Sequence, residues 1–89
     1  MVVRYLVRGD VQGVGFRWFV MREAHRLSLR GWVTNLPDGT VEVMADGPGT
    51  MLAELQRALA RGPSMAHVTS VENLDVPHDV VIPNSFNIK

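Results

Sequence analysis

Apolar and polar residues alternate from residue 2 to residue 8, in a stretch that carries Val, Tyr and Leu. Alternation of this kind, with β-branched and aromatic residues, predicts a strand. Two further strands are predicted at 30–35 and 40–46, and the Asp38-Gly39 turn signal between them makes the pair a hairpin. Segments 66–74 and 86–88 have the pattern of a fourth strand and a short terminal one.

A different period predicts two helices. From Phe16 to Leu29, apolar residues recur every three or four positions, and the same spacing runs from Thr50 to Arg61. The Gly62-Pro63 pair ends the second helix. The order strand, helix, strand, strand, helix, strand predicts one domain over residues 1–89 in the α+β class. The expected architecture is a ferredoxin-like α/β sandwich (βαββαβ), an antiparallel sheet with both helices on one face.

Composition narrows the classes of function. The chain has 89 residues, 46% of them hydrophobic, which is enough for one core. It has no cysteine, so disulfides, thiolate metal sites and a cysteine nucleophile are excluded. Nine basic residues balance nine acidic ones, so no broad positive field favours nucleic acid. Arginine interrupts the apolar N-terminal stretch, which predicts no signal peptide and no membrane partner. We expect a cytoplasmic monomer.

The candidate chemistry lies in the loop that joins the first strand to the first helix, where glycines stand at 9, 13 and 15. Successive N–H groups ahead of a helix N-terminus can form a concave nest that binds an anion. A tight turn without a ligand explains the glycines equally well. A Walker A motif is excluded because the loop has no lysine, and a dinucleotide fingerprint because Trp18 stands where its third glycine belongs.

Arg17 favours the anion. It falls in the first turn of the helix, where the helix dipole disfavours a cation. A bound phosphate would account for arginine there, because the planar guanidinium can hold two oxygens at once. The alternative is an exposed arginine in a weak surface ion pair.

The segment Val11-Gln12-Gly13-Val14-Gly15-Phe16-Arg17 resembles the signature of the acylphosphatase family. Gly31-Trp32-Val33-Thr34-Asn35 with Asp38-Gly39-Thr40-Val41-Glu42 resembles its second signature, and the likeness covers essentially the whole chain. The resemblance implies that Arg17 binds the phosphoryl group and that Asn35 positions the attacking water. It further implies that the loop backbone, Gln12, Gly13, Val14, Gly15 and Phe16, cradles the phosphoryl oxygens. The implied substrate is a small acyl phosphate, and inorganic phosphate or another anion could occupy the same site.

An acyl phosphate already has a good leaving group, so holding the phosphoryl group and aiming one water at phosphorus would suffice. No cofactor and no metal are expected. His25, His67 and His78 are scattered without ligand spacing, and we interpret them as surface or structural residues. Trp18 and Trp32 are expected to serve packing. Without the resemblance, Asn35 would be interpreted as a turn residue.

Two features depart from the expected pattern. Asp10 stands where the family often has a basic residue, and its carboxylate would weaken phosphate binding unless it points to solvent or pairs with Arg4 or Arg8. The segment 77–83 is unusually apolar, which leaves the conformation of 76–84 open. Two alternatives to the enzyme remain. One is a non-catalytic anion-binding module, and the other is an RNA-binding domain, which the neutral charge and the lack of an aromatic RNP pattern disfavour.

Overall fold

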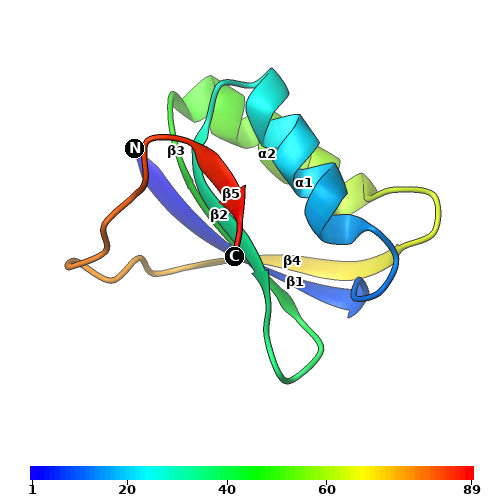
Figure 1. Cartoon of the computed structure of the whole chain (residues 1–89). Helices are drawn as coiled ribbons and strands as arrows, with labels where there is room; N and C mark the ends of the chain where they lie inside the picture. The colour runs from blue at the N-terminus through cyan, green and yellow to red at the C-terminus, as the bar shows by residue number, and fades with distance from the viewer.

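The computed structural model describes all residues from 1 to 89, and its elements follow the predicted order (Figure 1). They are β1 (Val2–Asp10), α1 (Phe16–Arg26), β2 (Arg30–Asn35), β3 (Val41–Asp46), α2 (Gly49–Arg61), β4 (His67–Leu74) and β5 (Phe86–Ile88). Neither helix has both the length and the apolar character that crossing a membrane requires.

The five strands form one sheet in the order β4-β1-β3-β2-β5. The first four pair antiparallel, as expected for the split βαβ arrangement. The terminal strand β5 adds to the edge beside β2 in a parallel register, so the complete sheet is mixed. The ferredoxin-like α/β sandwich predicted from the sequence is therefore confirmed.

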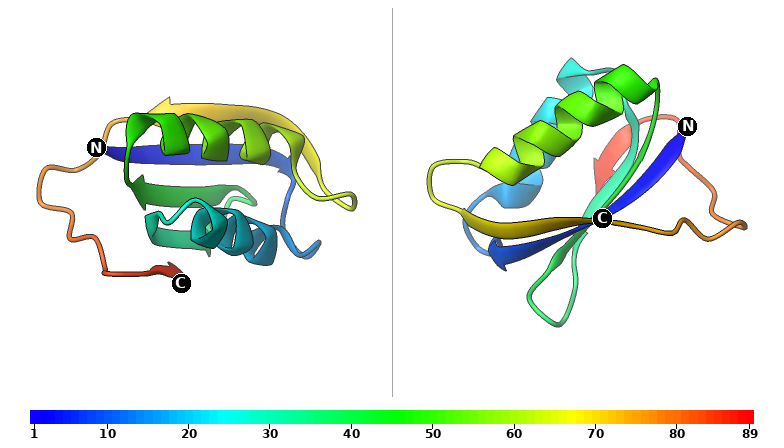
Figure 2. Two further views of the ribbon diagram at one scale, coloured as in Figure 1. Left: turned by 90° about the horizontal axis from the view of Figure 1, so that it is seen from above. Right: turned by 180° about the vertical axis from the view of Figure 1, so that it is seen from behind.

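Both helices lie side by side on one face of the sheet, and the other face carries no helix (Figures 1 and 2). The core lies between the two layers. Alternate strand residues point into it, and the stripes of the two helices meet them. Its members include Tyr5 and Val7 of β1, Val41 and Val43 of β3, Phe16 and Val20 of α1, and Leu55 and Leu59 of α2. This packing fixes the position of α1 over β2 and β5.

Two predicted boundaries were wrong. Helix α1 ends at Arg26 rather than at Leu29, because Ser28 takes a left-handed conformation with φ 57°. The Leu29 N–H then donates to the Ala24 carbonyl at 2.9 Å and turns the chain toward β2. Strand β1 continues to Asp10 rather than stopping at residue 8, since a bulge between Arg8 and Gly9 carries the pairing with β4 onward.

Other boundaries move by one residue: β3 begins at Val41, α2 at Gly49 and β4 at His67. The apolar segment 77–83 forms neither helix nor strand. It belongs to an irregular connection that leads from β4 out past the sheet and back to β5 (Figure 1). Its one backbone hydrogen bond is donated by the Val80 N–H to the Pro77 carbonyl, in a turn. Because the segment has no regular hydrogen-bonding pattern, the local sequence pattern could not predict its conformation.

Candidate active site

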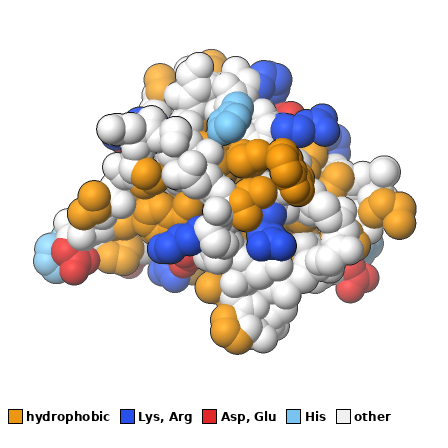
Figure 3. Space-filling view, in the orientation of Figure 1, with side chains coloured by type: hydrophobic (Ala, Val, Ile, Leu, Met, Phe, Trp, Pro, Cys, Tyr) orange, Lys and Arg blue, Asp and Glu red, His pale blue; other side chains and the backbone are white.

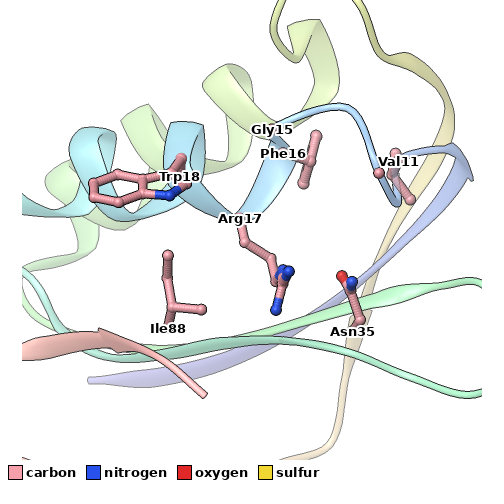
Figure 4. A pocket seen from close by; sticks show the side chains of 8 residues that line it. Val11, Gly15, Phe16, Arg17, Trp18, Asn35 and Ile88 are labelled. Atoms are coloured by element: carbon pink, nitrogen blue, oxygen red, sulfur yellow. The ribbon is translucent and has the colours of Figure 1, made fainter.

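A pocket of about 160 Å³ opens where the N-terminus of α1 faces the end of β2 and the strand β5 (Figure 4). Eight residues line it: Val11, Gly13, Gly15, Phe16, Arg17, Trp18, Asn35 and Ile88. Three separate parts of the chain thus contribute, namely the glycine loop with the first turn of α1, the last residue of β2, and β5. The sheet order places them together, since β2 lies between β3 and β5 beneath α1.

The start of α1 is left without a cap. Gly15 is its N-cap residue, with φ 77°, and no side chain accepts from the first N–H groups. The first turn also contains no acidic residue. The N–H groups of residues 16–18 have no acceptor inside the helix, because such acceptors would lie four residues earlier, in the loop. The positive end of the helix dipole is therefore uncompensated beside the pocket.

Arg17 adds a full positive charge at this end. Its guanidinium points into the pocket, toward Asn35 (Figure 4). Five other arginines are paired with carboxylates: Arg4, Arg8, Arg26, Arg30 and Arg57. Arg17 makes no ion pair and no hydrogen bond within the protein, so a surface ion pair does not explain its position.

Asn35 closes the polar side of the pocket. In β2, Val33 is fully buried against the helices, and Asn35 lies two residues further along on the same face. Its Oδ1 atom is buried and accepts no hydrogen bond from the protein. An unpaired buried carbonyl oxygen typically costs about 1–3 kcal/mol, which makes it a sign of function rather than of stability. The asparagine is therefore not merely a turn residue that satisfies its own backbone.

Gln12 lies in the predicted loop but does not line the pocket. Its amide nitrogen donates to the carbonyls of Leu36 and Thr40, both at 2.8 Å, and so ties the glycine loop to the β2–β3 turn. That turn is itself held by Asp38, whose carboxylate accepts from the Thr40 hydroxyl at 2.6 Å and from its N–H at 3.0 Å. These two bonds lower the pKa of Asp38. Gln12 thereby fixes the distance between the two halves of the pocket.

The remaining predicted loop residues divide between the pocket and the core. Gly13, Gly15 and Phe16 line the pocket together with Arg17, and Phe16 is also part of the hydrophobic core. Val14 is half-buried and packs against the core instead.

The sequence analysis missed three lining residues: Val11, Trp18 and Ile88. The prediction that both tryptophans pack was wrong for Trp18, whose side chain is 62% exposed at the pocket. Its place beside Arg17 in the first turn was the available signal. Trp32 does pack, on the opposite face of the sheet, with the Lys89 ammonium 4.4 Å from the ring centroid.

The carboxylate of Asp10 is exposed at the end of β1 and is not among the pocket residues. It pairs with neither Arg4 nor Arg8, because these bind Glu42 and Glu72. Of the two arrangements considered for Asp10, the structure has the one in which it faces solvent.

The histidines are all exposed, and only His25 has a partner, the Phe86 carbonyl at 2.9 Å from Nε2. No three His, Asp or Glu side chains come together in a group that could hold a metal ion.

Fold and site together define a class: a ferredoxin-like sandwich whose uncapped first helix and free arginine face an asparagine across a small pocket. The chain belongs to the acylphosphatase family, whose family model matches residues 3–88. It is therefore an enzyme of that family.

An acylphosphatase of Nitratidesulfovibrio vulgaris is 50% identical over 86 residues, which cover 96% of this chain and 86% of the relative. Among solved structures, an acylphosphatase from Bacillus subtilis is 39% identical with a TM-score of 0.85, over 100% of this chain and 99% of that one. HypF of T. kodakarensis is 33% identical with a TM-score of 0.85, and the match covers 100% of this chain but 12% of that protein.

Proposed function

We propose that this protein hydrolyses acyl phosphates to a carboxylate and inorganic phosphate in the pocket between α1 and β2. The observation that carries the proposal is the juxtaposition of Arg17 and Asn35. Each lacks a protein partner, and they face one another across a pocket lined by the start of α1 (Figure 4). A bound anion would accept hydrogen bonds from the uncapped start of α1 and from Arg17. A water molecule beside the anion would donate to the buried Oδ1 of Asn35.

The phosphoryl group is bound by two kinds of donor. The Arg17 guanidinium holds two of its oxygens in a bidentate arrangement, which is the strongest hydrogen-bonding geometry that a side chain offers a phosphate. The free N–H groups of the loop and of the first turn of α1 hold the others. As the transition state develops, charge spreads over the phosphoryl oxygens, and donors that are already in place stabilise it without reorganisation.

Asn35 positions the nucleophile. Its Oδ1 accepts one hydrogen of a water molecule, and its amide group can donate to the water oxygen. The water oxygen forms a bond to phosphorus while the bond from phosphorus to the acyl oxygen breaks. A phosphoryl oxygen takes the proton of the water. The acyl group leaves as a carboxylate, which needs no proton, so the reaction has no need of a general acid.

The pocket lining also supports a metal-independent reaction, because it contains no carboxylate, imidazole or thiolate ligand. Hydrolysis of benzoyl phosphate should therefore proceed at the same rate with and without a chelator. A rate that depended on added divalent metal would contradict this part of the proposal.

Arg17 is tested by its alanine variant. Arg17→Ala should lower kcat/KM for benzoyl phosphate by at least about 10²–10³-fold, the usual loss when a donor to a developing oxyanion is removed. Arg22→Ala is the matched control. Arg22 lies in the same helix, is exposed and makes no ion pair, so this variant should retain the wild-type rate. Equal rates in the two variants would refute the role of Arg17.

The match to one part of HypF keeps a second function in view, a non-catalytic anion-binding module. Inorganic phosphate would then raise the Tm of the protein, but no acyl phosphate would be hydrolysed. Calorimetric binding of phosphate, measured beside the benzoyl phosphate assay, separates the two functions.

A further inference from the structure

The pocket has an apolar side that hydrolysis of the phosphoryl group does not use. Figure 4 shows Trp18 and Ile88 on one side of the Arg17 guanidinium and Asn35 on the other. In the space-filling view, hydrophobic side chains gather on this face of the molecule, with basic side chains beside them (Figure 3). Val11 and Phe16, which line the Asn35 end, are buried, whereas Trp18 and Ile88 offer accessible apolar surface at the other end. This arrangement matches a substrate with one charged and one apolar end.

Trp18 has no structural reason to be tryptophan. It is the third residue of α1, a position where a capping box has Glu or Gln. Its indole is 62% exposed and does not pack against the hydrophobic core. A large apolar side chain is more stable in the core than in water, so its exposure beside a polar pocket indicates a binding role. Ile88, in contrast, is half-buried and packs against the core, so it gives the apolar side a fixed floor.

The reaction itself directs the acyl group to this side. In an in-line displacement, the attacking and leaving oxygens lie on opposite sides of phosphorus. With the phosphoryl group at Arg17 and the water at Asn35, the leaving carboxylate points away from Asn35. Trp18 and Ile88 lie in that direction (Figure 4).

On these grounds, and resting on the proposed function, we infer that Trp18 and Ile88 form a subsite for the acyl group. This subsite selects acyl phosphates with an aromatic or extended apolar acyl group over those with a small one. The flat indole face can stack on an aromatic ring, and apolar contact grows with the size of the acyl group. Trp18 is then a specificity-determining residue rather than a catalytic one.

The test compares benzoyl phosphate with acetyl phosphate, which share the phosphoryl group and differ in the acyl group. In Trp18→Ala, the ratio of kcat/KM for benzoyl to acetyl phosphate should fall about tenfold from its wild-type value. The rate with acetyl phosphate should stay near wild type. Trp18→Phe keeps an aromatic face and should keep most of the ratio. Met65→Ala is the control, because Met65 is 76% exposed and does not line the pocket.

Two results would overturn the subsite: an unchanged ratio in Trp18→Ala, or an equal loss for both substrates, which would indicate a merely structural role. If the wild-type protein hydrolysed neither substrate, the proposed function would fail instead. Calorimetry with benzoylphosphonate and acetylphosphonate, in which a P–C bond replaces the P–O bond that hydrolysis would break, tests the subsite in that event. Their affinity ratio should also fall about tenfold in Trp18→Ala, and an unchanged ratio would refute the inference.

Discussion

Replacing Asn35 by alanine should raise the stability of the protein while removing most of its activity. The Asn35 Oδ1 atom is buried without a hydrogen-bond donor, an arrangement that costs about 1–3 kcal/mol in the free protein. Alanine removes this oxygen and loses only the small packing contribution of the amide. We therefore expect a net stabilisation of about 1 kcal/mol, which corresponds to a rise in Tm of about 4–8 °C for a domain of this size.

Activity should change in the opposite direction. On the proposed mechanism, removing the amide leaves the water no longer held in line with the leaving group, so kcat should fall by about 10²-fold or more. Binding of inorganic phosphate should change little, because Arg17 and the N–H groups of the loop and α1 remain. In phosphate at 100 times its Kd, wild type and variant should thus both gain about 2.7 kcal/mol.

Urea denaturation and thermal melting, run beside the benzoyl phosphate assay, measure both effects. Asn73→Ala is the control, since Asn73 is an exposed asparagine in a strand and makes no side-chain hydrogen bond. Its stability and rate should remain near wild type. A loss of more than about 1 kcal/mol in Asn35→Ala would show that the amide makes a stabilising bond in the free protein, contrary to the reasoning here.

Three further substitutions test the supports of the pocket and of the sheet. Gln12→Ala removes both bonds from the loop to the β2–β3 turn, so kcat/KM should fall at least about tenfold while stability falls by about 1–2 kcal/mol, as assayed by kinetics and urea denaturation. Gly15→Ala leaves the new Cβ in open space but at φ 77°, so urea denaturation should show a loss of about 1–2 kcal/mol without misfolding. The Arg30 hydrogen bond lowers the pKa of Asp46 below its ordinary 3.8, so this contact stabilises the protein above that pH and the contribution is lost as the pH falls through the lowered pKa. Asp46→Asn should therefore be less stable than wild type at pH 7, by about 1 kcal/mol or less, and the gap measured by urea denaturation should close in acid.

The sequence by itself determined the elements and the architecture. Period-two and period-3.6 patterns depend only on which residues must face a core, and that requirement acts within each segment. The misplaced cation at Arg17 was likewise visible, because the helix dipole acts on its own first turn. Asn35 was different: its residue type and position favoured a turn, and only the resemblance of the surrounding segment indicated chemistry.

The tertiary structure decided which side chains lie next to one another. The local sequence pattern could not show that the Asn35 Oδ1 lies in a pocket without a hydrogen-bond donor. The residues that surround it there belong to α1 and to the glycine loop, which are distant in sequence. The same holds for Gln12, whose amide binds a turn more than 20 residues away, and for the parallel pairing that brings Ile88 beside Trp18. Each of these depends on contacts between segments distant in sequence. The period of the hydrophobic pattern shows only whether a residue faces inward or outward. The glycine loop therefore indicated an anion site, but only the fold placed Asn35, the supporting Gln12 and the apolar side chains of Trp18 and Ile88 around it.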